Sequence, residues 1–374
     1  MNDARILHVV TGPSFLNFVG GVFDEVAPGA NHVVGVGFDL THVALPDAVT
    51  RDSVPFGSEA TAMIVEKASR AALVIFHGVQ NPVIEAFAQV PPGPLVVWSG
   101  WGGDFYGNGF NPSAGLLGPL TSRLVRTQTD RSYWIDRAIE WKRLARVRRQ
   151  AARRAEYFSA PIPEDFAVFT RRFRQFAGAY IQLNYASIED TISRGHDRIS
   201  GRDILVGNSA SAENNHLDVF EHLRHQELGD ARVITPLSYG SPAYRDAVVS
   251  RGQDLFGDRF VPLVSSLPLD EYHDVMAGCS VVVMGHYRQQ GLGNVLRALW
   301  QGSHVVLDDR NPVKRYLSSR GVVVNDLHST RFGELASNSL GSREIVAHRE
   351  MLRQYWSRET VVENVRAVVA LAGL

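Results

Sequence analysis

Cysteine is nearly absent from this sequence of 374 residues, and the single one, Cys279, excludes an internal disulfide. A chain without disulfides suits a reducing compartment such as the cytoplasm. Long apolar runs are also missing, because no segment approaches the ~20 consecutive apolar residues that span a bilayer. The N-terminal stretch MNDARILHVVTGPSF is typical of a first strand and not of a signal peptide, since its apolar run is short and follows an acidic residue. We therefore expect any work at a membrane to be done from its surface.

Neither sign of charge is in excess, and the net charge of -1 gives no global case for a nucleic-acid partner. The sequence contains no P-loop, no GxSxG elbow and no GxGxxG fingerprint after its first strand, which disfavours kinases, hydrolases and dehydrogenases. The histidines lack paired ligand spacing, and Asp308 with Asp309 is the nearest approach to a DxD pair. We expect no metal and no cofactor.

What the sequence does contain is a repeated alternation of short apolar runs and helical patterns, with a hydrophobic content of 45%. In the first half, β-branched runs at 5–10, 32–38, 72–78 and 94–100 alternate with helical patterns such as 58–70, as in buried parallel strands. The second half predicts strands at 204–206, 232–236, 260–263, 280–284, 304–308 and 322–324, with helices between them. This pattern predicts an α/β protein of two doubly wound, Rossmann-like domains.

The expected domains are 1–200, which includes one long basic helix over 131–154, and 201–345. A helical tail, 346–374, is expected to pack back toward the first domain. The length supports this division, because domains of about 150 to 200 residues are the norm.

The stretch MGHYRQQGLGN is the most informative loop of the second half, because it connects a predicted strand to a predicted helix. Gly291 and Gly293 allow close backbone approach, and Asn294 can cap the helix, whose free N–H groups can bind phosphate oxygens. The alternative is a plain glycine turn. Five further polar side chains that a turn alone does not need favour a ligand: His286, Tyr287, Arg288, Gln289 and Gln290.

Two other predicted strands of the second half also end in polar loops. One is followed by Gly207, Asn208 and Ser209, and the other by a loop containing Tyr239. Each loop alone is more typical of a turn than of a site. Because parallel strands end at one edge of a sheet, the three loops together favour a nucleotide-type pocket.

In the first half, His77 and Asn81 follow one strand, while Trp98, Trp101 and Asp104 belong to the strand and loop that come next. A lone histidine at a strand end is usually structural. An aspartate in a loop lined by Trp and Gly is a better candidate for acid–base work, because desolvation raises a carboxyl pKa. The tryptophans also suit stacking on a sugar ring.

The helix over 131–154 is strongly cationic and carries an apolar stripe at helical spacing. One interpretation is a solvated charged helix docked on its own domain. The other is attachment to anionic lipid head groups or to a lipid pyrophosphate through Arg143, Arg146, Arg149 and Arg153.

Taken together, the segments FHGVQNP, WSGWGGDFYG, ILVGNSASAENNHLDVF, VITPLSYGSPAY and RQQGLGNVLRALWQG resemble the bacterial 4-acetamido-4,6-dideoxy-D-galactose (Fuc4NAc) transferases, which are glycosyltransferase family 56-like. The resemblance extends from about Leu73 to Asn325. It implies a GT-B fold and a metal-independent, inverting enzyme. The implied reaction moves Fuc4NAc from its dTDP-sugar to an undecaprenyl-pyrophosphate-linked saccharide, as in enterobacterial common antigen synthesis, at the cytoplasmic face of the inner membrane.

The resemblance also implies roles for individual residues. His216 and the three strand-end loops of the second half lie near the donor, with Arg288 neutralising the pyrophosphate. Asn81, Trp98 and Trp101 lie on the acceptor side, with Asp104 as the base and His77 as its alternative. Many retaining GT-B enzymes carry two glutamates at the spacing that here falls on Gln289 and Arg297, so the usual ribose-binding carboxylate is missing. Three alternatives stay open: a transferase with another donor or acceptor, a non-catalytic nucleotide-sugar binding protein, and a GT-B-like epimerase.

Overall fold

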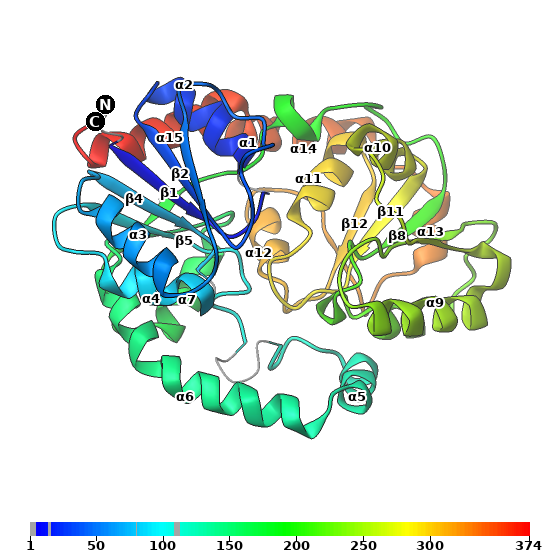
Figure 1. The fold of residues 1–374 in the computed structure, drawn as a ribbon. Helices are drawn as coiled ribbons and strands as arrows, with labels where there is room; N and C mark the ends of the chain where they lie inside the picture. Colours follow the sequence, from blue (N-terminus) through cyan, green and yellow to red (C-terminus); the bar gives the residue numbers. More distant parts are fainter. Residues whose placement is uncertain (1–4, 14–15, 80, 108–112) are drawn as a thin grey trace. The chain divides into compact units, whose positions relative to one another are not determined.

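The computed structural model describes residues 5–13, 16–79, 81–107 and 113–374. Contacts between Cα atoms divide the chain into two compact units. Unit 1 consists of Met1–Pro112, Trp134–Ala186 and Arg358–Leu374, and unit 2 consists of Ser113–Tyr133 and Ser187–Ser357. Each unit is built around one parallel sheet with helices on its faces (Figure 1).

Unit 1 contains a seven-stranded parallel sheet in the order β3-β2-β1-β4-β5-β6-β7. Its strands are β1 Ile6–Val10, β2 Asn31–Val36, β3 Thr50–Val54, β4 Leu73–His77, β5 Leu95–Ser99, β6 Tyr157–Ala160 and β7 Ala179–Gln182. Its helices are α1 Leu16–Phe18, η2 Val19–Phe23, α2 Asp24–Val26, α3 Ser58–Ala68, α4 Asn81–Gln89, α6 Arg131–Arg154, α7 Glu164–Arg172 and α15 Arg358–Leu371. The first residues of α6 belong to unit 2, and the helix belongs to unit 1 from Trp134 onward.

The core of unit 1 lies on both faces of this sheet. Every residue of β1 and β4 is buried, as expected for central strands covered on two sides. One face packs against α3, α4, α6 and α7, and the other packs against η2 and α15. Helix α15 supplies five buried valines to the second face: Val361, Val362, Val365, Val368 and Val369.

Unit 2 contains a six-stranded parallel sheet in the order β10-β9-β8-β11-β12-β13. Its strands are β8 Asp203–Val206, β9 Val233–Pro236, β10 Phe260–Leu263, β11 Cys279–Met284, β12 His304–Leu307 and β13 Asn325–Asp326. Its helices are α5 Pro119–Gln128, η3 Ile188–Ile192, η4 Ala212–Asn214, α8 His216–Leu223, α9 Pro242–Phe256, η5 Gly257–Arg259, α10 Leu269–Ala277, α11 Leu292–Gln301, α12 Pro312–Ser318, α13 Phe332–Ser337 and α14 Ser342–Trp356.

The predicted α/β class with two doubly wound sheets is confirmed. The predicted strand at 322–324 is wrong, because the chain leaves α12 through Gly321, at φ +78°, and pairs with β12 only at Asn325 and Asp326. The two units also divide differently from the expected domains. The boundary falls at residue 187 and not at 200, and Ser113–Tyr133 belongs to unit 2. The expected tail is split, with α14 in unit 2 and α15 in unit 1.

None of the helices within the described ranges combines the length and apolar content that crossing a lipid bilayer requires.

Candidate functional site

The carboxyl ends of β8, β9 and β10 in unit 2 surround a cavity of about 280 Å³. Three residues that the sequence placed near a donor line it together, namely Asn208 after β8, Tyr239 after β9 and Asn294 in the first turn of α11. Tyr272 of α10 and the segment 265–267 complete the wall. The predicted convergence of separate strand ends on one edge of the sheet therefore exists in the fold.

Two hydrogen bonds order the polar side chains of this cavity. The Asn208 amide donates to the hydroxyl of Tyr239 at 3.1 Å, and the Asn294 amide donates to the hydroxyl of Tyr272 at 2.7 Å. Asn294 was expected to cap α11, but it is the third residue of the helix. The N-cap is Gly291, in the left-handed conformation at φ +65°, which an L side chain rarely adopts.

Gly207, Ser209 and His216 lie behind this cavity and do not line it. Gly207 has φ +74°, and a Cβ there would come within 2.4 Å of the His216 ring. Ser209 and His216 are fully buried, and the Ser209 hydroxyl accepts a hydrogen bond from Asn214 at 3.1 Å. Burial lowers the pKa of His216 to about 3, so its ring is neutral. These three residues shape the loop after β8 from the inside.

The loop after β11 carries the remaining predicted donor residues, and its arginine is already paired. The Arg288 side chain donates from Nε to Glu213 at 2.5 Å and from Nη1 to the carbonyl of Gln289 at 2.9 Å. Gln289 is 7% exposed, and one oxygen of Glu213 also accepts from Ser113 at 3.0 Å. The expectation that Arg288 neutralises a pyrophosphate therefore needs correction, because its charge is met by Glu213.

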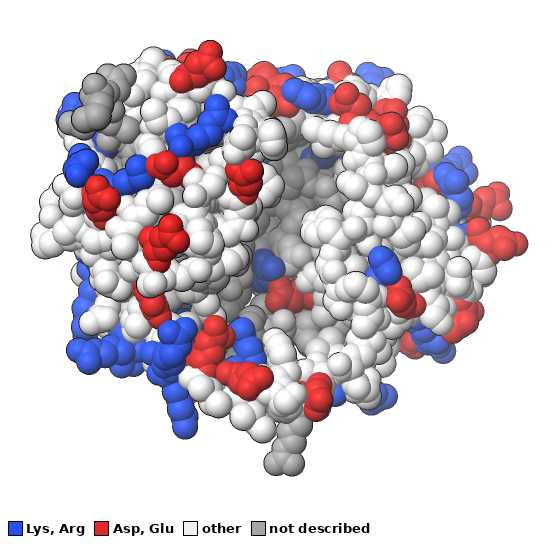
Figure 2. Space-filling model, in the orientation of Figure 1, with Lys and Arg blue, Asp and Glu red and all other residues white. Residues whose placement is uncertain are grey.

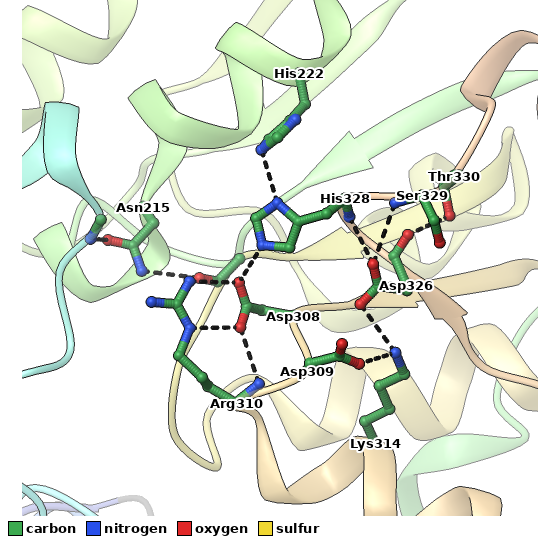
Figure 3. A network of polar contacts seen from close by, with 12 residues as sticks. Asn215, His222, Asp308, Asp309, Arg310, Lys314, Asp326, His328, Ser329 and Thr330 are labelled. Carbon is green, nitrogen blue, oxygen red and sulfur yellow. Dashed lines mark hydrogen bonds and ion pairs between the residues drawn. The ribbon is translucent and has the colours of Figure 1, made fainter.

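Tyr287 of the same loop packs against Arg310, which belongs to an ion-pair network that the sequence did not reveal. Figure 3 shows Arg310, Asp308, His328 and His222 of this network. The Arg310 guanidinium lies 3.3 Å from the centre of the Tyr287 ring and donates to both carboxylate oxygens of Asp308, each at 2.8 Å. His328 donates to Asp308 at 3.0 Å and bonds His222 at 3.1 Å. Burial alone would raise the pKa of Asp308, but the hydrogen bonds from Arg310 and His328 lower it. The sequence feature that could have indicated Asp308 is its position directly after β12.

Asn215 connects this loop to α5 and was also missed. Its side chain accepts from the Gly118 N–H at 2.8 Å and donates to the carbonyls of Leu116 and Gly285, at 3.1 and 2.8 Å. Asn215 has φ +54°, and no other non-glycine residue in the described ranges has a positive φ. Asparagine tolerates this conformation better than most residues. Its hydrogen bonds fix the chain at the start of the loop after β11.

In unit 1, His77 is a core residue and not an accessible base. It is fully buried, its ring bonds His8 at 3.0 Å and the hydroxyl of Tyr185 at 2.9 Å, and His8 in turn bonds Asn31 at 3.1 Å. Burial lowers the pKa of His77 well below its usual range. A neutral ring inside this chain of hydrogen bonds orders the strand ends, so the role considered for His77 on the acceptor side needs correction.

Asp104 is half-buried and braces the loop after β5. Its carboxylate accepts from the indole N–H of Trp98 at 2.8 Å and from the backbone N–H groups of Trp101 and Val79, at 2.9 and 3.2 Å. Burial raises the pKa of Asp104, and the three donors oppose that shift. The combination leaves a carboxylate that is more basic than an exposed one and fixed in position.

The two tryptophans have different surroundings. Trp98 is 1% exposed and packs against Phe87, Phe169 and Phe173, so its ring cannot offer a face to an acceptor sugar and that expectation is wrong. Trp101 is partly exposed and stands edge-on to the Tyr185 ring at 4.7 Å. Trp101 keeps a surface that a ligand can reach.

Helix α6 spans Arg131–Arg154, as predicted, and has a cationic outer face (Figure 2). Arg148 on its inner side donates to Asn81 at 2.7 Å, so Asn81 is occupied by a contact within unit 1. Arg143 pairs with Glu85 at 2.7 Å. Three arginines at helical spacing are exposed and have no ion-pair partner among the residues that the structure describes: Arg146, Arg149 and Arg153.

No cluster of three or more His, Cys, Asp or Glu side chains suited to a metal ion occurs within the described ranges.

The predicted GT-B fold is confirmed, because solved structures with this fold match the two parallel α/β units. HepE from Anabaena, solved with UDP and glucose, matches with a TM-score of 0.62 and 13% identity over 99% of this chain and 100% of that one. Sucrose-phosphate synthase from Thermosynechococcus elongatus matches with a TM-score of 0.64 and 10% identity over 98% of both chains. A UDP-forming trehalose-phosphate synthase from Burkholderia vietnamiensis matches with a TM-score of 0.63 and 8% identity over 99% of both chains.

The model of the family described as 4-alpha-L-fucosyltransferase, glycosyl transferase group 56, matches residues 56–330. The chain belongs to this family, as the sequence motifs predicted, and is therefore a glycosyltransferase.

Proposed function

We propose that the protein transfers Fuc4NAc or a closely similar deoxy-amino sugar from a dTDP-sugar to an undecaprenyl-pyrophosphate-linked saccharide during surface-polysaccharide synthesis. The observation that carries the proposal is the cavity at the strand ends of unit 2, lined by Asn208, Tyr239 and Asn294. Membership of a family described as a fucosyltransferase supports a 6-deoxy sugar, since fucose is 6-deoxygalactose. The UDP complex of HepE supports a nucleotide-linked donor.

The side chains around the cavity support a deoxyribose nucleotide in particular. None of the described residues that line it is acidic, so no carboxylate is present there to bind the two hydroxyls of a ribose. Arg297, at a position where related enzymes keep a glutamate, is buried and donates to the carbonyls of Ile192 and His196. Its guanidinium is committed to backbone groups of its own unit. A donor nucleotide without a 2′-hydroxyl therefore loses less binding energy from the missing carboxylate than a ribonucleotide does.

The diphosphate of the donor would bind the first turn of α11. The first N–H groups of a helix have no carbonyl partner within the helix and carry partial positive charge. Gly293 is exposed there, and a Cβ at that position would meet nothing within 4 Å. With Arg288 paired to Glu213, these N–H groups are the main stabilisers that we propose for the leaving dTDP.

A nucleotide series tests the donor assignment. We expect dTDP to raise the melting temperature, with UDP and GDP giving smaller shifts at equal concentration. A ligand at 100 times its Kd stabilises the native state by about 2.7 kcal/mol. The measurement is a thermal-shift titration of the intact chain with each diphosphate. A preference for UDP would contradict the proposal and favour a transferase with another nucleotide sugar.

Two glycine variants test whether the diphosphate binds the first turn of α11. Gly293→Ala is expected to stabilise the fold by up to about 1 kcal/mol, because alanine favours a helix, while weakening dTDP binding through its added methyl group. Gly291→Ala is the matched control. Its φ of +65° and a Cβ 3.1 Å from Met284 predict lower stability. If Gly293→Ala binds dTDP as well as the wild type, the diphosphate does not lie on this turn.

The proposed reaction is a metal-independent, inverting displacement. A base removes the proton of the acceptor hydroxyl as the dTDP departs. Asp104 is the residue that we propose as this base, because burial raises its pKa and hydrogen bonds hold it in place. A non-catalytic sugar-nucleotide binding protein is the chief alternative from another class, and it would release no dTDP when given donor and acceptor.

The outer face of α6 supports work at the cytoplasmic face of the inner membrane. Ile135 and Ile139 are 53% and 63% exposed, and they lie on the same side of the helix as the exposed Arg146, Arg149 and Arg153. Apolar side chains beside cations are the combination that binds an anionic membrane surface. We propose that this face binds the membrane that contains the lipid-linked acceptor.

Vesicle binding tests the role of α6. Replacing Arg146, Arg149 and Arg153 together with alanine should weaken binding to phosphatidylglycerol vesicles roughly 100-fold, since each cation contributes about 1 kcal/mol near an anionic surface. A co-sedimentation assay at low salt measures this. The matched control replaces three exposed arginines of unit 2, Arg315, Arg331 and Arg343, and should bind as the wild type does. Equal losses in both variants would show a general charge effect and would contradict a specific surface.

A further inference from the structure

The loop that carries Trp101 and Asp104 packs against Tyr185, a residue to which the proposed reaction assigns no role. Tyr185 follows β7, the strand at one edge of the unit 1 sheet, and its hydroxyl reaches back to the ends of two inner strands. It bonds the ring of His77 at the end of β4, at 2.9 Å, and the hydroxyl of Ser99 at the end of β5. One side chain therefore connects three strand ends of the sheet.

The Tyr185 hydroxyl belongs to a chain of hydrogen bonds that begins at Asn31. The Asn31 amide donates to the carbonyl of Ala27 at 2.8 Å, so its oxygen faces His8 and accepts from His8 Nε2 at 3.1 Å. Burial lowers the pKa of His8 to about 4, so the ring is neutral at pH 7 and its Nδ1 carries no proton. His8 Nδ1 therefore accepts from Nε2 of His77, at 3.0 Å.

The same reasoning fixes the direction of the remaining hydrogen bonds. Burial lowers the pKa of His77 well below its usual range, so its Nδ1 also carries no proton and must accept from the Tyr185 hydroxyl. The Tyr185 oxygen then accepts from the hydroxyl of Ser99, which is fully buried. Because only one arrangement of protons satisfies every member of the chain, the Tyr185 hydroxyl is held in a single position.

The ring of Tyr185 is also fixed, and it contacts Trp101 directly. Its centre lies 4.6 Å from that of the Phe18 ring and 4.7 Å from that of the Trp101 ring, which it meets edge-on. Burial raises the pKa of Tyr185, and the side chains of Ser99 and Trp101 oppose that shift, so both act on its hydroxyl. Trp101 is partly exposed, and its backbone N–H donates to Asp104 at 2.9 Å. Tyr185 thus fixes the indole next to the carboxylate.

We propose that Tyr185 is a positioning residue for the acceptor, because it holds the Trp101 indole with its exposed surface toward a sugar ring of the acceptor saccharide. This inference rests on the proposed transferase function. Apolar side chains of the same shape could fill the interior at little cost in stability, whereas a fully satisfied polar chain specifies one geometry. Geometry is decisive at such a site, since a misplacement of about 1 Å can lower turnover about 100-fold.

Tyr185→Phe tests the proposal, because it removes the hydroxyl and keeps the ring. We expect the KM for the acceptor to rise about 10-fold, which corresponds to about 1.4 kcal/mol, while the KM for the donor stays as in the wild type. The measurement is dTDP release at varied acceptor with saturating donor, and at varied donor with saturating acceptor.

Tyr180→Phe is the matched control. Tyr180 lies on β7 of the same unit, and its hydroxyl bonds the carbonyl of Ala160 at 2.9 Å and the side chain of Gln182 at 2.8 Å. We expect both variants to lose similar stability in urea unfolding, but only Tyr185→Phe to change the KM for the acceptor. If Tyr185 had only a structural role, the two variants would have the same acceptor KM.

A second measurement follows the Trp101 indole and does not depend on turnover. The chain is labelled with fluorotryptophan at its six tryptophans, and Trp101→Phe identifies the fluorine NMR signal of Trp101. We expect this signal to shift or broaden in Tyr185→Phe and to stay unchanged in Tyr180→Phe.

Either of two results in Tyr185→Phe would overturn the proposal, namely an unchanged Trp101 signal or an unchanged KM for the acceptor. A wild-type chain that releases no dTDP with this acceptor would contradict the proposed function. The fluorine signal would then still decide whether Tyr185 positions Trp101, so the two failures are distinguishable.

Discussion

Asp104→Asn is expected to lower turnover at least about 100-fold while leaving dTDP binding unchanged, since removing a general base typically costs that much. Asparagine has nearly the same shape and keeps one oxygen acceptor for the surrounding N–H groups, but it cannot take up the proton of an acceptor hydroxyl. The measurement is dTDP release in the presence of donor and acceptor. A thermal-shift titration with dTDP checks the donor site of the same variant.

The structure gives Asp104 a second role, as a brace, and the two roles can be separated. Trp98→Phe removes the indole N–H that donates to Asp104 at 2.8 Å but leaves the carboxylate in place. We expect this variant to lose about 1.5 to 3 kcal/mol of stability, the value of a hydrogen bond to a charged group, and to retain most of its turnover. If the folded Asp104→Asn variant has normal turnover, Asp104 is not the base and its role is only structural.

Acidification is expected to destabilise the protein strongly between pH 7 and pH 5.5. Burial lowers the pKa of His8 to about 4 and that of His216 to about 3, from 6.5 in an unfolded chain. Below pH 6.5 the unfolded chain takes up protons on these histidines, whereas the folded chain does not. Their contribution is thus fully present above pH 6.5 and is lost as the pH falls toward the folded values.

The size of the acid effect follows from linkage. Each of these two histidines removes about 1.2 kcal/mol from the free energy of unfolding between pH 7 and pH 5.5, or about 2.5 kcal/mol together. His77 and His286 are also fully buried with pKa values well below the usual range, and they act in the same direction. Urea unfolding at a series of pH values measures the sum. A free energy of unfolding that does not change over this range would show that the four rings are not buried as neutral groups.

One variant isolates a single histidine. Neither ring nitrogen of His286 has a hydrogen-bond partner among the described residues, so leucine can replace it with little loss of contacts. His286→Leu should therefore flatten the pH dependence. His42→Gln changes an exposed histidine and should leave the dependence as it is in the wild type.

The strands that sequence patterns predict well are the central, apolar ones. β1, β4 and β11 are continuous runs of buried residues, and β5 is buried except at Leu95, which local composition reveals directly. The polar run TRDSV of β3 lies at a sheet edge with its residues half exposed, so its composition resembles that of a loop. β13 has only two residues, and its position depends on pairing with β12. Pairing partners far apart in sequence leave no periodic signal.

Some features of the candidate site can likewise be predicted from the sequence, and others cannot. Strand-end loops are visible in sequence, and Asn208, Tyr239 and Asn294 do converge. What sequence could not show is which polar side chains are already paired. Arg288 meets Glu213, 75 positions away, and Asn215 bonds Leu116, 99 positions away. These contacts decide whether a charge is available to a ligand, and they exist only after the chain has folded.

Helix α15 has a consequence for how the protein is made. The five valines that it adds to the core of unit 1 are synthesised after all of unit 2. While the ribosome is still translating unit 2, this face of the first sheet can pack against η2 but not against α15, so apolar residues such as Ile75 and Val97 lack part of their packing. A nascent chain of this kind can complete its second unit before its first, and a premature stop near residue 357 would leave a finished unit 2 joined to an unfinished unit 1.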